Sequence, residues 1–169
     1  VTAMFAEKAA SVDNTNAIYM TEVGYQCLMR GKVREAQRYY KTATKLDESS
    51  VPALSGIIQC QLLDGQYDIA KEQLDFLKEI QSSVSNKAEI MYMNAQLGRM
   101  TGKPAEEVMT TLNEAVDSHF KTVRGLTFGA EYLAALNPDF VTNLVKEYLI
   151  YAPSYPTAQG QAVPLSLGL

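Results

Sequence analysis

The chain has 169 residues, of which 47% are hydrophobic and 20% are charged, and its formal net charge is −4. This length suits one domain or a short repeat array, and the composition is ordinary for a soluble globular protein. The weak negative charge argues against nucleic-acid binding, and no stretch approaches the roughly 18 apolar residues that a membrane-spanning helix needs. We therefore expect neither nucleic-acid binding nor direct membrane insertion.

The opening stretch, VTAMFAEKAASVD, lacks the basic region and following apolar run of a signal peptide. Its small and apolar residues, Ala6, Ala9 and Val12, recur at helical spacing and match the end of the second helix of a helix pair. We interpret residues 1–14 as the end of a preceding repeat. We accordingly expect the chain to be a fragment of a longer array.

The most informative pattern is a helical repeat that returns in phase. Gly31 and Gly65 are 34 residues apart, and each lies between two helix-like segments. Five residues after each glycine stands a small residue, Ala36 and then Ala70, where the two helices of a pair are expected to cross closely. A period of about 34 residues with two helices and a tight turn is typical of a tetratricopeptide array. Such pairs stack into a solenoid with an extended groove, and both alanines are predicted to be almost fully buried.

One frame describes the array along the chain. Its repeats start at Ala17, at Val51 and, three residues late, near Ala88. A fourth, degenerate repeat is aligned with Thr122 at its first position, and Asn137-Pro138-Asp139 is predicted to cap its second helix. Residues 15–153 therefore form an array of about four helix pairs. Residues 154–169 contain two prolines and two glycines and are predicted to be a linker.

The second repeat departs from the first where a small residue is expected. The first repeat carries Gly24 at this position of its first helix, whereas the second carries Ile58. A larger side chain would separate the two helices of the pair. We expect either looser packing there or compensation by the neighbouring Gly56.

The groove of such an array is lined by one face of the first helix of each repeat. In this frame the lining residues are Ile18, Thr21, Tyr25 and Leu28, then Pro52, Ser55, Gln59 and Leu62, then Glu89, Tyr92, Gln96 and Arg99. Our candidate partner-binding residues on this face are Ile18, Thr21, Tyr25, Leu28, Tyr92 and Gln96. The two tyrosines are the candidate anchors, because buried aromatic side chains dominate many interfaces. Alternatively, these residues pack against adjacent helices of the longer solenoid.

Charged residues form two matching stripes. Arg34, Arg38, Lys41 and Lys45 recur along one second helix, and Asp68, Glu72, Asp75 and Glu79 stand 34 residues further on. One interpretation is a local ladder that places Arg38 near Glu72 and Lys41 near Asp75, with each exposed pair contributing about 0–1 kcal/mol. A second is that the basic stripe binds an acidic neighbour in an assembly, so its four residues are also candidate partner-binding residues. The third is plain solvated surface.

The sequence offers little that could support catalysis or metal binding. His119 is the single histidine and is expected to have a structural role at a helix end. Cys27 and Cys60 lie in apolar helical patterns and are expected to be buried free thiols, consistent with a reducing compartment. Glu106-Glu107 is interpreted as a solvated face, and no metal-ligand spacing or phosphate-binding loop is present. We predict no enzyme and no cofactor.

The sequence also resembles a known family. The stretch TEVGYQCLMRGKVREAQRYYKTATKLDESSVPALSGIIQCQLLDGQ, then EQLDFLKEIQSS, LNPDF, KEYL and GQAVPL, resembles an internal segment of the tetratricopeptide repeat protein 21 family. That family is the large repeat subunit of intraflagellar transport complex A. The resemblance implies an all-α tetratricopeptide-repeat solenoid, with antiparallel helix pairs in a right-handed superhelix and no catalytic residues.

The resemblance further implies a scaffold for retrograde transport and ciliary protein trafficking. Its partners would be other complex A subunits, ciliary cargo adaptors and the flanking repeats of its own chain, in the cytoplasm and the cilium, including the axoneme and the ciliary base. The alternative is a peptide receptor of the co-chaperone type. Such receptors hold a terminal carboxylate with Lys and Asn on the groove face, where this chain has Thr21 and Tyr25. This difference disfavours the alternative.

Overall fold

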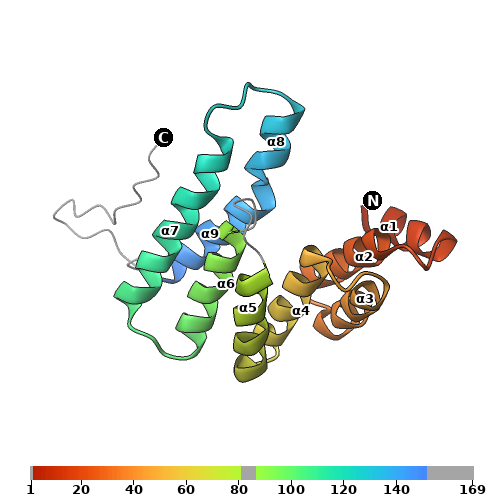
Figure 1. Ribbon diagram of the computed structural model, residues 1–169, viewed down its shortest axis with the longest axis horizontal. Helices are drawn as coiled ribbons and strands as arrows, with labels where there is room; N and C mark the ends of the chain where they lie inside the picture. Colours follow the sequence, from red (N-terminus) through yellow and green to blue (C-terminus); the bar gives the residue numbers. More distant parts are fainter. Residues whose placement is uncertain (1, 81–86, 152–169) are drawn as a thin grey trace.

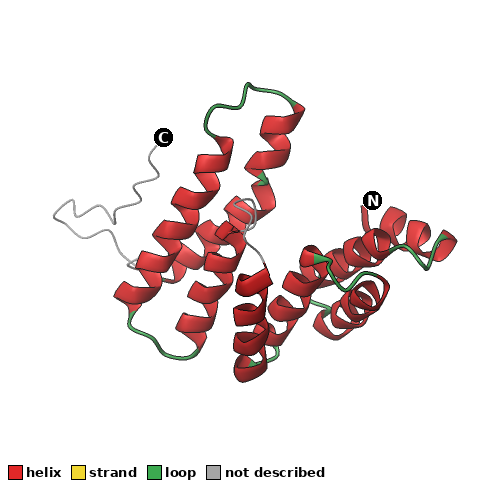
Figure 2. Cartoon of the chain, viewed as in Figure 1, coloured by secondary structure: helices red, strands yellow, loops and turns green. Residues whose placement is uncertain are grey.

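The computed structural model describes residues 2–80 and 87–151, and in this part of the chain the regular structure is entirely helical (Figures 1 and 2). The helices are α1 (Thr2–Val12), α2 (Ala17–Met29), α3 (Val33–Leu46), α4 (Val51–Leu63), α5 (Tyr67–Ile80), α6 (Lys87–Met100), α7 (Ala105–Val123), α8 (Ala130–Leu136) and α9 (Pro138–Ile150). The predicted linker, 154–169, lies outside the described residues. No helix within the described ranges combines the length and the apolar character needed to cross a membrane.

From α1 to α7, each helix packs chiefly against the helices before and after it in the chain. The helices therefore form successive antiparallel pairs, and Figure 1 shows these pairs following one another along a curved path. Such neighbour-to-neighbour packing is the defining property of a solenoid, because each pair buries its apolar face on the next pair. The predicted all-α solenoid is confirmed.

Three helix-to-helix turns share one geometry. Gly31, Gly65 and Gly102 have positive φ angles of 73°, 76° and 80°. In each turn the amide of the residue after the glycine donates to a carbonyl five residues earlier, as Lys32 N does to Cys27 O at 3.0 Å. This is the Schellman end of a helix, which places its C′ residue in the left-handed region where glycine has no steric penalty. The spacing of these glycines therefore marks the turns.

The core consists of two clusters that meet at α4. One face of α4 supplies Ala53, Ile57 and Cys60 to the cluster shared with α1, α2 and α3, and another face supplies Ile58 and Leu62 to the cluster shared with α5, α6, α7 and α9. A helix that is apolar on two sides is expected in the middle of a stack, where it has neighbours on both sides. As predicted, Ala36 and Ala70 are completely buried.

Tyr40 of α3 packs between two glycines. A methyl group added to Gly24 of α2 would lie 2.9 Å from its ring, and one added to Gly56 of α4 would lie 2.6 Å from Cε2 and closer still to Cζ and Cε1. The Tyr40 ring is itself buried. The expected compensation for Ile58 by Gly56 within its own helix pair therefore does not occur; Gly56 accommodates Tyr40 of the preceding pair. Ile58 is buried in the next core cluster.

At the end of the array, the predicted start of the fourth repeat is wrong. Thr122, aligned there as the first position of a new helix pair, lies in the last turn of α7, because His119 and Val123 are buried and extend the apolar face of α7. The short α8 packs against α7, and α9 packs against α7 and α6, so α8 and α9 do not reproduce the packed helix pair predicted for a fourth repeat. Asn137 then begins α9, as predicted, and its side chain accepts a hydrogen bond from Phe140 N at 3.3 Å.

Candidate partner-binding site

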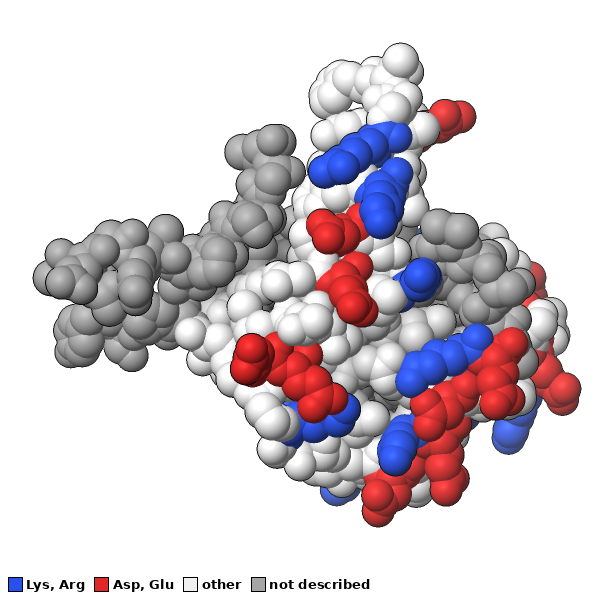
Figure 3. All heavy atoms as spheres, turned by 60° about the vertical axis from the view of Figure 1, so that its left-hand side comes forward, with Lys and Arg blue, Asp and Glu red and all other residues white. Residues whose placement is uncertain are grey.

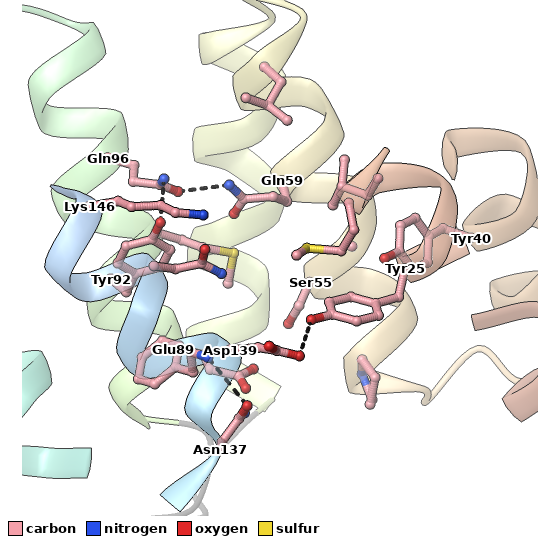
Figure 4. Close-up of a pocket in the computed structure, with 18 of the residues that line it drawn as sticks. Tyr25, Tyr40, Ser55, Gln59, Glu89, Tyr92, Gln96, Asn137, Asp139 and Lys146 are labelled. Carbon is pink, nitrogen blue, oxygen red and sulfur yellow. Dashed lines mark hydrogen bonds between the residues drawn. The ribbon is translucent and has the colours of Figure 1, made fainter. Parts of the chain in front are cut away.

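A cleft of about 660 Å³ opens between the first helices of successive pairs and the last helix (Figure 4). Three of its walls are formed by α2, α4 and α6, and the fourth is formed by α9. Tyr40 of α3 reaches the same cleft between its two glycines. The cleft therefore combines side chains from helices that are far apart in the sequence.

The repeat pattern in the sequence predicted much of the surface that lines this cleft. Nine of the residues assigned to the groove line the cleft: Thr21, Tyr25, Leu28, Pro52, Ser55, Gln59, Glu89, Tyr92 and Gln96. They include all but one of the candidate partner-binding residues of the groove face. Whether they bind a partner stays a prediction.

Three groove assignments were wrong. Ile18 is 76% exposed at the start of α2 and is not among the cleft residues. Leu62 is 1% exposed in the core, and Leu63 lines the cleft instead, because it lies one helical turn after Gln59. Arg99 binds Glu147 of α9 and does not line the cleft.

Polar side chains form a hydrogen-bonded row on the cleft wall. Gln59 Nε2 donates to Gln96 Oε1 at 3.0 Å, and Gln96 Nε2 donates to Tyr92 Oη at 2.7 Å (Figure 4). Burial raises the pKa of Tyr92 to about 12. This row connects α4 to α6 and fixes the orientation of both amide groups.

Two contacts hold α9 across the cleft. Tyr25 Oη of α2 donates to Asp139 Oδ2 in the first turn of α9 at 2.7 Å (Figure 4). Burial, together with Asp139, raises the pKa of Tyr25. Further along α9, Glu147 is only 4% exposed and forms a bidentate ion pair with Arg99 of α6, in which Arg99 Nη2 donates to Glu147 Oε2 at 3.4 Å. The hydrogen bond of Glu147 raises the pKa of the Arg99 guanidinium.

Sequence reasoning missed the wall that α9 contributes. The residues involved, including its capping residue, are Asn137, Asp139, Phe140, Asn143, Lys146, Glu147 and Ile150. The Asn-Pro-Asp cap indicated where this helix begins. No local pattern indicated that the helix would pack against α6 and α7 and face α2 across the cleft.

The cleft carries an excess of negative charge. Its lining residues include the carboxylates Glu22, Glu89, Asp139 and Glu147, and Lys146 is the lysine among them. Glu147 is already paired with Arg99. Burial raises the pKa of Glu89, and among the described residues no ion pair compensates its charge.

The predicted charge ladder is wrong. All four residues of the basic stripe are exposed on α3, but within the described residues no ion pair joins them to the acidic stripe on α5. The reason is that α4 packs against both α3 and α5 and separates them. The acidic stripe is instead interleaved with lysines of its own helix, and Lys78 Nζ lies 2.8 Å from Asp75 Oδ1. Figure 3 shows such interspersed charges on one face of the molecule.

The remaining chemically notable residues have structural surroundings. His119 is buried, its Nε2 donates to the Leu136 carbonyl oxygen at 2.9 Å, and its ring packs on Phe140. Cys27 and Cys60 are buried and are not part of a disulfide, and burial raises the pKa of Cys60 to about 11. In the part of the chain that the structure describes, no three metal-ligating side chains come together.

Comparisons with known proteins agree with this architecture. Residues 1–167 match a family model described as the second ARM domain of tetratricopeptide repeat protein 21. Human tetratricopeptide repeat protein 21B is 46% identical over 155 residues, which cover 92% of this chain, and the mouse protein is 43% identical over 162 residues, which cover 96%. Mouse tetratricopeptide repeat protein 21A is 36% identical over 159 residues, 94% of this chain. In each case the match spans 12% of the relative's length.

Proposed function

Because the chain belongs to the tetratricopeptide repeat protein 21 family, we propose that it is a protein-binding segment of a scaffold subunit of intraflagellar transport complex A. In this role it would support retrograde transport and ciliary protein trafficking. Its partners would be other complex A subunits and ciliary cargo adaptors, in the cytoplasm and in the cilium at its base and along the axoneme. Flanking repeats of the same polypeptide would contact its two ends.

The observation that carries a binding role is the cleft between α2, α4, α6 and α9. Its walls are held in place by hydrogen bonds and an ion pair between helices. It presents apolar side chains together with a few oriented polar groups, which is the usual make-up of a recognition site. A preformed site of this kind loses little conformational entropy when a partner binds.

The co-chaperone alternative is not favoured. A receptor for a terminal carboxylate needs cations that converge on one point. Among the described lining residues, Lys146 stands alone against four carboxylates. The electrostatics of the cleft therefore oppose an anionic ligand.

The proposal is tested by using the chain as bait in extracts of ciliated cells and measuring the recovery of complex A subunits by mass spectrometry. Ser55→Trp would fill the cleft from α4, and Thr110→Trp on the exposed surface of α7 is the matched control. We expect the unmodified chain and the control to recover complex A subunits and the cleft variant to recover fewer. No recovery by the unmodified chain would refute the proposed assembly, and full recovery by Ser55→Trp would exclude the cleft as the contact.

A further inference from the structure

Three of the four cleft carboxylates form no ion pair within the described residues, and Lys146 is the one lysine among the residues that line the cleft with them. Asp139 and Glu22 accept hydrogen bonds from neutral donors, the hydroxyl of Tyr25 at 2.7 Å and the amide of Gln26 at 2.8 Å. A neutral donor orients a carboxylate but leaves its charge in place. A partner that enters this cleft therefore meets a negative potential, which favours a cation.

Glu89 is the carboxylate on which this argument depends most. It is half-buried in the first turn of α6, and within the described residues it has neither an ion pair nor a hydrogen bond. Burial raises the pKa of its carboxyl group, so the charged form is disfavoured in the free protein. A cation placed beside it would remove this penalty, because a desolvated charge gains most from a partner.

Two tyrosines face the same space. Tyr25 comes from α2 and Tyr92 from α6, and both line the cleft (Figure 4). The faces of tyrosine rings attract ammonium and guanidinium groups and also pack against the alkyl stems of Lys and Arg. Carboxylates among tyrosines thus match a basic side chain better than they match an aliphatic or an acidic one.

Amide groups on the cleft walls can bind the backbone beside such a side chain. Gln59 uses one N–H to reach Gln96, which leaves its carbonyl oxygen and its second N–H available for a ligand. Asn143 lines the opposite wall from α9. A volume of about 660 Å³ holds a short chain segment and excludes a folded domain. Extended segments present their backbone groups to such amides.

We infer that this cleft binds an extended segment of a partner protein that inserts a Lys or Arg side chain toward Glu89 and between Tyr25 and Tyr92. The inference rests on the proposed scaffold function and specifies the chemistry of the partner. Glu89 neutralises the inserted cation, the tyrosines enclose its alkyl stem, and Gln59 binds the adjoining backbone.

The test uses the immobilised full chain and three pools of blocked peptides with randomised flanks, in which the central residue is fixed as Arg, Gln or Glu. Retention of each pool is measured by mass spectrometry. We expect the Arg pool to be enriched about tenfold over the Gln pool and the Glu pool to be retained least. Equal retention of the Arg and Gln pools, or strongest retention of the Glu pool, would overturn the inference.

Glu89→Gln keeps the shape of the side chain and removes its charge, so it should reduce the preference for Arg over Gln about tenfold. Glu72→Gln, on the exposed face of α5, is the matched control and should leave the preference unchanged. Asp139→Asn, which retains an acceptor for Tyr25, provides a second test and should weaken Arg-pool binding. An unaltered preference in Glu89→Gln would contradict the inference. The recovery of complex A subunits by the same variants is measured in a separate experiment. The proposed function in complex A can therefore hold even if the cleft shows no preference for a basic peptide.

Discussion

The contact between Tyr40 and Gly56 gives the most direct test of how the helix pairs pack. Gly56→Ala would add a methyl group less than 3 Å from three ring carbons of Tyr40, a separation that packed atoms do not tolerate. The ring cannot move toward α2, since Gly24 already lies close to its other side. The substitution must therefore displace either the ring or α4.

The expected free-energy change is the difference between two effects. Replacing a mid-helix glycine with alanine usually stabilises a helix by about 0.5–1 kcal/mol. Overpacking a buried site typically costs about 1–3 kcal/mol. We expect the packing cost to exceed the helix gain and to leave a net loss of about 1–2 kcal/mol. For a chain of this length such a loss lowers the melting temperature by about 2–8 °C.

The measurement is thermal unfolding followed by circular dichroism. Gly24→Ala is the graded comparison: its added methyl group would lie 2.9 Å from the same ring, a smaller overlap, so we expect a smaller loss of melting temperature than for Gly56→Ala. In a Tyr40→Leu background the obstruction is absent, and Gly56→Ala should be neutral or stabilising. A rise in melting temperature for Gly56→Ala in the unmodified chain would refute the packing argument, as would equal effects in both backgrounds.

Three further predictions concern charged residues. Arg99→Met should lower the free energy of unfolding by about 2–3 kcal/mol in a chemical denaturation experiment, because it leaves the buried Glu147 without its cation; a loss below about 0.5 kcal/mol would contradict this. Glu89→Gln should raise the melting temperature at neutral pH and lose this effect as the pH falls below the ordinary carboxyl pKa of 4.5; an equal effect at both pH values would be inconsistent with a raised pKa. The effect has this direction because a raised pKa means that the folded state binds the carboxyl proton more tightly than the unfolded state does. The charged form of Glu89 therefore lowers the stability of the fold above the ordinary pKa. Replacing the basic stripe (Arg34, Arg38, Lys41 and Lys45) with Glu should change the melting temperature by no more than about 4 °C, whereas a larger, salt-sensitive loss would support the ladder that the structure contradicts.

Much of the array could be predicted from the sequence because the interactions that define it are local. The turns at Gly31 and Gly65 depend on a left-handed φ angle that glycine adopts without strain. Ala36 and Ala70 are buried because the two helices of a pair, joined by a short turn, must cross near them. Helical periodicity likewise placed most groove residues on one face.

The fourth repeat and two groove residues show where local patterns fail. The repeat pattern placed the start of the fourth repeat at Thr122. In the structure the buried face of α7 continues past His119, so the helix extends through Thr122 to Val123. Leu62 and Leu63 are both apolar, so composition could not determine which faces the cleft. The choice follows from the orientation of α4 between two core clusters, which is a property of the assembled stack.

The sequence by itself determined the helix pairs, their turns and the face that each first helix presents, because these depend on contacts among residues a few positions apart. Only the tertiary structure decided that α9 closes the cleft, where Tyr25 meets Asp139 across 114 positions of sequence. It also decided that α4 separates the two charge stripes. The closing of the cleft depends on the small rotation between successive helix pairs, which accumulates along the stack and is encoded by no single segment. The separation of the stripes depends on the packing of α4 against both α3 and α5.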